Sequence, residues 1–324
     1  MRIGFVDSAH PLLAEQLVAA GHECTALHQV DDAHLVDALA GHQGIVVRSR
    51  QLSADLLRQL GDLKFIGRLG SGLENIDRDY CKKAGIAVFN SPEGNRDGVA
   101  ETAVMLLLML LKHAVRGNEQ AHTGLWLREE NRGTDLEGKT VGIIGFGHMG
   151  SAFAQRLHGF DVRVMAHDKY LKNYATAGVE ECALEQLQEE CDAISLHLPL
   201  TKETTHFVDA AFIARMRKPF WLINTARGGV VHTASLLDGL DSGKVIGAGL
   251  DVLEFERPDL SGLDLGREPH TMKRLLGHEH VVITPHIAGV THEGKRKMAE
   301  VLVRKILAFA AGSAPEAATG RTGP

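Results

Sequence analysis

The sequence predicts an α/β protein made of two doubly wound domains, each with a parallel sheet covered by helices. Three observations support this fold class. Short apolar runs alternate with helical stretches along the chain, a pattern typical of parallel sheets with right-handed crossovers. The length of 324 residues exceeds what one ordinary core holds. A predicted helix over Asp97–Arg116, apolar nearly all round in its middle, divides the strands into two series.

The first series alternates four predicted strands with four predicted helices. The strands are expected at Arg2–Val6, Gly44–Val47, Phe65–Gly67 and Ala87–Phe89. The helices are expected at Pro11–Ala20, Asp32–Ala40, Ala54–Leu60 and Asp77–Ala84. Each strand is a short apolar run bounded by polar or turn-forming residues.

The second series contains six predicted strands. They are expected at Thr140–Ile144, Val162–Ala166, Ala193–His197, Phe220–Asn224, Val245–Asp251 and Val281–Thr284. Helices are expected at Ser151–His158, near Thr271–Leu276 and at Glu293–Ala311, the last returning the chain to the first domain. We therefore expect one domain of residues 1–96 plus 290–324, with a disordered tail at 312–324, and a second domain of residues 97–289.

Charge and composition exclude several functional classes. With 35 Lys and Arg against 41 Asp and Glu, the formal charge is −6, and no basic tail is present to bind nucleic acid. The longest apolar run, Ala103–Leu111, is about half of the ~20 residues that a membrane span needs. The N-terminus lacks a signal-peptide pattern, and the four cysteines form no close pair of metal-site spacing. We therefore expect a cytoplasmic protein with reduced thiols.

A glycine-rich loop directly follows the strand Thr140–Ile144. Gly145-Phe146-Gly147-His148-Met149-Gly150 fits the GxGxxG pattern of Rossmann dinucleotide-binding domains, with a helix predicted after it. The first glycine permits a tight turn, and the second lets the backbone approach a pyrophosphate at the helix N-terminus. Asp168 ends the next strand, 168 − 150 = 18 residues on, near the ~20 expected for an acid that binds the adenosine ribose. A carboxylate there repels a 2′-phosphate, so the predicted cofactor is NAD.

Polar residues also follow the later strands, at the sheet edge where ligands bind in such folds. Arg227 follows the strand Phe220–Asn224 and offers a fork of donors for a carboxylate. His286 follows the last strand and titrates near neutrality, so it can exchange a proton, and Glu256 could hold its imidazole. Taken singly, each residue is equally consistent with a surface ion pair or a solvated loop. Together, at successive strand ends, they predict an acid–base site.

These segments resemble the D-isomer-specific 2-hydroxyacid dehydrogenase family over nearly the whole chain and in the expected order. Besides the glycine loop, the matching stretches are Gly67–Asp77, His197–Thr204, Asn224–Gly229, Gly249–Glu256 and Thr284–Gly289. The resemblance implies a Rossmann NAD-binding domain and a flavodoxin-like substrate domain. It also implies hydride transfer between NAD and a small 2-hydroxy or 2-oxo acid.

The resemblance assigns roles to matching positions. Arg227 would orient the substrate, His286 would exchange the proton, and Glu256 would pair with His286. Cofactor contacts are implied at Gly145, Gly147, His148, Met149, Gly150, Asp168, His197, Leu198, Pro199, Thr225, Ala226, Asp251, Ala288 and Gly289. The loop Gly70-Ser71-Gly72 would lend backbone donors to the substrate carboxylate. One departure is Arg257 before Pro258, where the family shows the acid followed directly by proline, so the geometry beyond Glu256 is left open.

The particular substrate has to be argued from the first domain. Arg48-Ser49-Arg50 and Arg68 follow neighbouring strands and place two or three guanidinium groups on one rim, where paired donors hold a phosphate. The Arg-Ser-Arg run is similar to that of phosphoglycerate dehydrogenases, as is Trp126-Leu127-Arg128, from which Arg128 would reach the neighbouring subunit's substrate. We therefore expect 3-phosphoglycerate and 3-phosphohydroxypyruvate, the serine-biosynthesis pair, to be the substrates. Ordinary surface ion pairs at Arg50 and Arg68 are the alternative.

Two other functions stay open. A glyoxylate or hydroxypyruvate reductase needs one arginine for the carboxylate and no phosphate clamp, and an NAD-sensing corepressor would keep the same Arg, Glu and His set. Four histidines near the end of the chain are not expected to converge, so no metal is predicted; they are His278, His280, His286 and His292. The expected assembly is a homodimer formed through the 97–116 helix and the Trp126 segment, with no membrane or nucleic-acid partner.

Overall fold

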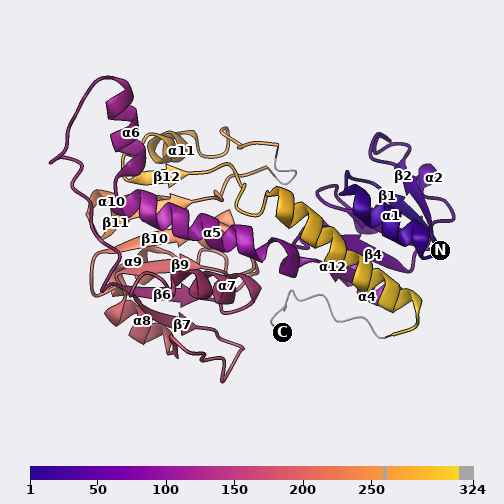
Figure 1. Cartoon of the computed structure of the whole chain (residues 1–324). Coiled ribbons are helices and arrows are strands. Elements are labelled where there is room, and N and C mark those ends of the chain that lie inside the picture. The colour runs from indigo at the N-terminus through magenta and orange to yellow at the C-terminus, as the bar shows by residue number, and fades with distance from the viewer. Residues whose placement is uncertain (258–260, 314–324) are drawn as a thin grey trace. The chain divides into compact units, whose positions relative to one another are not determined.

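The computed structural model describes residues 1–257 and 261–313, and these form two compact α/β units (Figure 1). Unit 1 comprises Met1–Arg96 with residues 290–313 and Ser261, and unit 2 comprises Asp97–Arg257 with Gly262–Gly289. Each unit has one parallel sheet, which confirms the predicted fold class. The tail predicted at 312–324 lies outside the described residues except for its first two positions, and so does Pro258.

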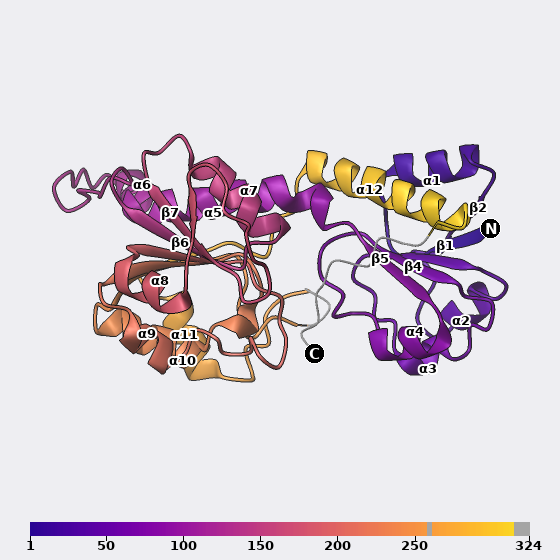
Figure 2. The ribbon, with the colours of Figure 1, turned by 90° about the horizontal axis from the view of Figure 1, so that it is seen from below.

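Unit 1 has a five-stranded sheet in the order β2-β1-β3-β4-β5, the flavodoxin-like order. Its strands are β1 (Arg2–Phe5), β2 (Glu23–Ala26), β3 (Gly44–Val47), β4 (Phe65–Arg68) and β5 (Ala87–Asn90). Its helices are α1 (Pro11–Ala19), α2 (Leu35–Ala38), α3 (Ala54–Leu57), α4 (Arg78–Ala84) and α12 (His292–Ala310). Figure 2 shows α1 and α12 on one face of this sheet and α2, α3 and α4 on the other. The sequence analysis missed β2, an edge strand with a polar sequence.

The core beneath α1 and α12 explains why the last helix packs in unit 1. Phe309 of α12 contacts Phe65 and Phe89 of the sheet, with ring centroids 5.6 and 5.4 Å away. Leu302 lies fully buried, and a Cβ added at Gly67 of β4 would come within 3.1 Å of it. Apolar residues of α12 therefore complete a core that the first 96 residues leave open on this face.

Unit 2 has a seven-stranded sheet in the order β12-β11-β10-β9-β6-β7-β8. Its strands are β6 (Thr140–Ile144), β7 (Arg163–His167), β8 (Val179–Glu181), β9 (Ala193–Leu196), β10 (Phe220–Asn224), β11 (Val245–Leu250) and β12 (Val281–Ile283). Its helices are α5 (Pro92–Leu111, beginning in unit 1), α6 (Ala114–His122), α7 (His148–Leu157), α8 (Leu184–Glu190), α9 (Ala210–Arg215), α10 (Thr233–Asp241) and α11 (Pro269–Leu276), with a 3₁₀ turn at Gly228–Val230. Because β6 pairs with both β7 and β9, the strand order reverses beside β6, and such switch points are where ligands bind.

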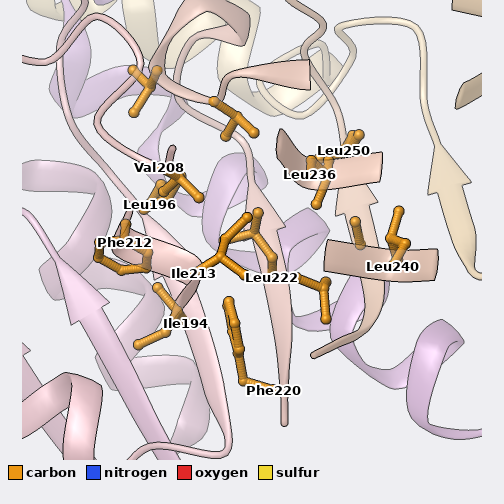
Figure 3. Close-up of a cluster of buried hydrophobic side chains, with 14 of the residues drawn as sticks. Ile194, Leu196, Val208, Phe212, Ile213, Phe220, Leu222, Leu236, Leu240 and Leu250 are labelled. Carbon is orange, nitrogen blue, oxygen red and sulfur yellow. The ribbon is translucent and has the colours of Figure 1, made fainter. Parts of the chain in front are cut away.

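One face of this sheet packs against α9 and α10 (Figure 3). Phe220 and Leu222 of β10 meet Phe212 of α9 and Leu240 of α10 in a cluster of buried side chains. These strands are buried near-continuous apolar runs, as expected of a parallel sheet covered on both faces. Because of that pattern, the predicted bounds of β9, β10 and β11 agree with the observed bounds to within one residue at each end.

The helix predicted over 97–116 is wrong in both its start and its end. It begins at Pro92 and ends at Leu111, and α6 follows after a bend of 64°. His113 causes the break, since its φ of +48° is left-handed and cannot continue a right-handed helix. Neither glycine nor proline marks the position in the sequence. Among the described residues no single helix is long and apolar enough to cross a membrane; α5 and α6 satisfy that test only as a bent pair.

Candidate active site

The glycine loop has the geometry that a dinucleotide site requires. Gly145 has a φ of +91°, and an added Cβ would lie 2.5 Å from the carbonyl oxygen of His197. An added Cβ at Gly150 would lie 2.1 Å from the oxygen of Gly145, so α7 packs directly on the loop. At Gly147 an added Cβ would meet nothing within 4 Å, so the backbone there faces open space. The three glycines thus make the turn, leave room for a pyrophosphate and let the helix approach, which fits NAD.

Asp168 ties the glycine loop to the end of β7. Its Oδ2 accepts the N–H of Phe146 at 2.9 Å, and its Oδ1 accepts those of Tyr170 and Leu171, each at 2.9 Å. Burial by itself raises the pKa of Asp168, but these three N–H donors outweigh it and leave the pKa below its usual value. The carboxylate is therefore ionised at neutral pH, and its remaining lone pairs suit a ribose hydroxyl.

Tyr174 supports the same corner, and the sequence analysis missed it. Its hydroxyl donates to the oxygen of Ala166 at 2.8 Å and accepts the N–H of Asp168 at 2.9 Å. Its ring stacks on Phe146 with the centroids 4.9 Å apart. A single tyrosine in a polar loop carries no pattern that would mark it, because its partners come from a strand and a turn earlier in the chain.

His197 lies beneath the glycine loop. Its Nε2 is 2.9 Å from the Oγ of Ser195, and its ring packs against Phe153 at 5.4 Å. Burial lowers the pKa of His197 to about 3, so the imidazole is neutral. Its Nδ1 is buried without a hydrogen-bond partner in the described chain. The predicted cofactor contact of His197 would therefore involve its backbone rather than its ring.

His286 and Glu256 form a close pair. The Nδ1 of His286 donates to Oε2 of Glu256 at 2.8 Å, and Oε1 of Glu256 accepts the N–H of Leu253 at 2.8 Å. The two side chains are 31% and 18% exposed, so a small acid in solution can reach the histidine. The φ of His286 is +54°, a conformation that costs energy for any residue except glycine and often marks a functional site.

Asp251 holds the backbone that carries His286. Its buried carboxylate accepts the hydroxyl of Thr284 at 2.5 Å and the N–H groups of Ile287 and Ala288, each at 2.9 Å. The N–H of His286 also donates to the carbonyl oxygen of Asp251 at 2.8 Å. The sequence analysis assigned Asp251 to the cofactor. In the structure both carboxylate oxygens accept hydrogen bonds from the loop after β12, so Asp251 holds the backbone beside His286, and its cofactor contact stays a prediction.

Arg227 is placed by a tight turn after β10. The side chain of Asn224 accepts the N–H of Ala226 and donates to the oxygen of Arg227, both at 3.0 Å. The next residue, Gly228, lies so close to the loop after β11 that an added Cβ would be 1.9 Å from the oxygen of Leu253. Glycine therefore lets the loop of Arg227 lie directly against the loop that leads to Glu256.

A second histidine–glutamate pair joins the loop after β9, which carries His206, to the loop after β11, which carries Glu254. The Nε2 of His206 donates to Oε1 of Glu254 at 2.7 Å, and Oε2 of Glu254 accepts the N–H of Thr233 at the start of α10. The sequence analysis gave no role to either Glu254 or His206. No sequence motif links His206 to Glu254, because the two residues come from different loops.

The backbone of the arginine run after β3 binds a carboxylate of the same unit. The N–H groups of Arg48, Ser49 and Arg50 all donate to Oδ2 of Asp7, at 2.7, 2.9 and 3.1 Å. Three successive N–H groups make a concave anion site, and a carboxylate of the same unit fills it. The backbone of this run, including Ser49, is therefore engaged within unit 1.

The guanidinium of Arg50 is partly engaged within unit 1, and its contact with substrate stays a prediction. Its Nη2 donates to the oxygen of Val30 at 2.6 Å, and its Nε lies 3.3 Å from Asp32. The neighbouring Arg48 is exposed. Sequence reasoning treated the two arginines alike, and only the fold distinguishes them.

The loop predicted to bind the substrate carboxylate is tethered to β5. Gly70 has a φ of +140°, and its N–H donates to Oγ of Ser91 at 3.0 Å. Asn90 donates to the oxygen of Ser71 at 2.7 Å. Of the three predicted backbone donors, that of Gly70 is thus already used, and those of Ser71 and Gly72 stay as predictions. Arg128 is exposed, and within residues 1–257 and 261–313 no group of His, Cys, Asp or Glu has the arrangement of a metal site.

A switch-point glycine loop, a ribose-type acid and an acid–base pair at neighbouring strand ends define an NAD-binding oxidoreductase domain. Residues 104–288 match the family described as "D-isomer specific 2-hydroxyacid dehydrogenase, NAD binding domain". The chain belongs to the D-isomer specific 2-hydroxyacid dehydrogenase family, as the sequence resemblance implied.

Relatives named for different activities have similar sequence identity to this chain. D-3-phosphoglycerate dehydrogenase of Bacillus subtilis is 34% identical over 94% of this chain, which spans only 55% of that relative's length. Hydroxypyruvate reductase of Thermotoga maritima is 38% identical over 81% of this chain and 83% of the relative. The crystal structure of D-lactate dehydrogenase from Aquifex aeolicus, complexed with NAD and lactic acid, is 30% identical, with a TM-score of 0.81 over 96% of each chain.

Proposed function

We propose that the protein catalyses NAD-dependent hydride transfer between a D-2-hydroxy acid and the matching 2-oxo acid. The observation that carries this proposal is the His286–Glu256 pair in an NAD-binding domain, in which Glu256 binds Nδ1 of His286, and Nε2 is the nitrogen that faces substrate in the proposal. Arg227 lies in the turn after β10, and the strands β10, β11 and β12 are neighbours in the sheet. An arginine for the acid, an imidazole for the proton and a carboxylate for the imidazole are the groups that this reaction needs.

Each residue then has one task. Arg227 binds the substrate carboxylate and orients the reacting carbon. During oxidation, His286 takes the hydroxyl proton on Nε2, since Nδ1 is already bonded to Glu256, and it returns that proton during reduction. The negative charge of Glu256 stabilises the imidazolium. Bound NAD supplies the hydride acceptor, and the glycine loop with Asp168 would hold its pyrophosphate and ribose.

We propose 3-phosphoglycerate and 3-phosphohydroxypyruvate as the substrate pair, which would place the enzyme in serine biosynthesis. Exposed Arg48 at the end of β3 and the similarity to phosphoglycerate dehydrogenases support this choice. The second candidate is a glyoxylate or hydroxypyruvate reductase. The binding of Arg50 to Val30 and Asp32 favours it, because this contact removes one cation from the predicted phosphate clamp.

Initial rates of NADH oxidation distinguish these candidates. The panel is 3-phosphohydroxypyruvate, hydroxypyruvate, glyoxylate and pyruvate, measured with the wild type, Arg48→Ala and Arg50→Ala. We expect a preference for the phosphorylated acid and a KM for it raised roughly tenfold in Arg48→Ala, the effect of losing one charged hydrogen bond. We expect Arg50→Ala to lower stability and to leave KM near the wild-type value. Preference for hydroxypyruvate or glyoxylate would establish the reductase, and no rate with any acid would contradict the dehydrogenase proposal.

We also propose that the protein is a homodimer formed through α6 and the segment that follows it. No side chain of α6 is buried, and Leu125 and Trp126 beyond it are 52% and 79% exposed. Side chains of this size are frequent in buried interface cores. Sedimentation of the wild type and of Trp126→Glu tests this: a dimer that dissociates in the variant is expected, and a wild-type monomer at micromolar concentration would contradict it.

A further inference from the structure

A charged cluster next to the proposed ribose site is not used by the mechanism above. Lys169 and Tyr170 follow Asp168 directly at the end of β7. Glu203 lies on the loop after β9, the other strand that borders β6 on this edge of the sheet. Its Oε1 accepts a hydrogen bond from the Nζ of Lys169, and its Oε2 accepts the hydroxyl of Tyr170 at 2.5 Å. One carboxylate therefore holds both residues.

The position of Lys169 gives this cluster a consequence for the cofactor. Asp168 favours a ribose with a free 2′-hydroxyl, but a cation beside it would attract the 2′-phosphate of NADP. In this chain that cation is engaged by Glu203. The hydrogen bond to Glu203 raises the pKa of Lys169, and the bonds from Lys169 and Tyr170 lower the pKa of Glu203, so both partners are charged at neutral pH.

We propose that Glu203 is a specificity-determining residue that acts through Lys169. By engaging the ammonium group, it prevents Lys169 from binding a 2′-phosphate and so maintains the preference for NAD over NADP. This inference rests on the proposed cofactor site at the glycine loop. Glu203 is a positioning residue here, since it contacts Lys169 and Tyr170 rather than reacting atoms.

The expected effect is moderate because the cluster is exposed. The side chains of Lys169 and Glu203 are 64% and 43% exposed, so water and salt weaken their interaction. A unit charge about 4 Å from a phosphate in water changes affinity by roughly fivefold. The effect should shrink as ionic strength rises, because exposed charges are screened within about 10 Å at ordinary salt.

The test measures binding of ADP-ribose and 2′-phospho-ADP-ribose to the intact protein by titration calorimetry. The variants are Glu203→Gln, Lys169→Met and the double substitution. We expect Glu203→Gln to increase the relative affinity for the 2′-phosphorylated probe roughly fivefold at low salt. ADP-ribose affinity should stay near the wild-type value. In the Lys169→Met background, removing Glu203 should give a clearly smaller gain.

Glu180→Gln is the matched control. It removes the same charge and also breaks an exposed ion pair, with Arg163 at the opposite end of β7. We expect no change in probe selectivity from it. Equal gains in the presence and absence of Lys169, or no gain from Glu203→Gln, would overturn the inference while leaving the cofactor site intact. If the wild type bound neither probe nor NADH, the proposed cofactor site itself would be wrong.

Discussion

Two histidine–glutamate pairs in unit 2 share nearly the same nitrogen–oxygen distance and the same histidine backbone conformation, and only one of them contains the proposed acid–base residue. His286–Glu256 and His206–Glu254 have nitrogen–oxygen distances of 2.8 and 2.7 Å. Both histidines have a φ of +54°, and both glutamates come from the loop after β11. Neither the distance nor the backbone conformation therefore separates a reacting histidine from a supporting one.

The nitrogen that is used distinguishes the pairs. His206 donates a hydrogen bond to Glu254 from Nε2, the ring nitrogen farther from the backbone. Its ring packs against that of His232, with the centroids 4.7 Å apart. The other oxygen of Glu254 binds Thr233, so this pair joins the loop after β9 to the start of α10. His286 instead donates to Glu256 from Nδ1, so that Nε2 can meet the substrate in the proposed mechanism. In His286 the hydrogen bond at Nδ1 fixes the tautomer and the ring orientation, and the proposed mechanism uses Nε2.

The largest expected effect comes from removing the imidazole of His286. His286→Gln should lower kcat roughly 1,000-fold, since it removes the general acid–base, while NADH affinity stays near the wild-type value. His206→Gln is the matched control and should change kcat by less than about threefold, because the Nε2 of His206 is already bound to Glu254 and does not exchange the proton in the proposed mechanism. Single-turnover hydride transfer and NADH titration give both readouts. A comparable loss of kcat in His206→Gln would show that the two pairs do not differ in the way described.

A smaller effect on kcat is expected from replacing the glutamate of each pair. Glu256→Gln can still accept a hydrogen bond from Nδ1, but it removes the charge that stabilises the imidazolium, so kcat should fall roughly 100-fold. Glu254→Gln makes the same change on the same loop and should leave kcat within a few-fold of the wild type. Measuring both under single-turnover conditions compares the charges directly. Equal losses would indicate a general effect of loop charge rather than support of His286.

The smallest expected effect is on stability and depends on pH. Burial raises the pKa of Glu254, but hydrogen bonds from Thr233 and His206 outweigh it and leave the pKa below its ordinary value. A lowered folded-state pKa stabilises the fold above the unfolded value of about 4.3, and this stabilisation disappears as pH falls through the folded value. Glu254→Gln should therefore cost on the order of 1 kcal/mol at pH 7.

Urea unfolding of the wild type and of Glu254→Gln measures this difference from neutral to acid pH. The two midpoints should converge as pH falls below the ordinary glutamate pKa. A gap that stays constant down to the acid-unfolding region would show that the charge of Glu254 does not stabilise the fold.

Much of the fold was predictable because strands in covered parallel sheets are local apolar runs. The runs that became β3, β6 and β10 have the predicted bounds unchanged. The two missed strands, β2 and β8, lie at sheet edges and contain polar residues, so they lack that signal. The break at His113 was missed because a left-handed histidine has no local marker.

The candidate site was predictable where a residue's place follows from the end of a strand. The glycine loop and Arg227 come after the buried strands β6 and β10, His286 comes after the half-buried edge strand β12, and parallel strands bring such ends to one edge. The family resemblance added their roles. The sequence offered no comparable signal for Tyr174 or His206, whose partners belong to other loops.

The sequence by itself thus determined the two-domain α/β class, the family, the glycine loop and the strand-end residues, because hydrophobic periodicity and short motifs are properties of neighbouring residues. Only the tertiary structure decided which polar groups are already hydrogen-bonded to other residues of the chain. Asp7 binds the run Arg48–Arg50 from 41 to 43 residues away, and Glu203 binds Lys169 from 34 residues away. A buried or bonded polar group takes whichever partner the fold brings within about 3 Å, and chain separation does not encode that choice.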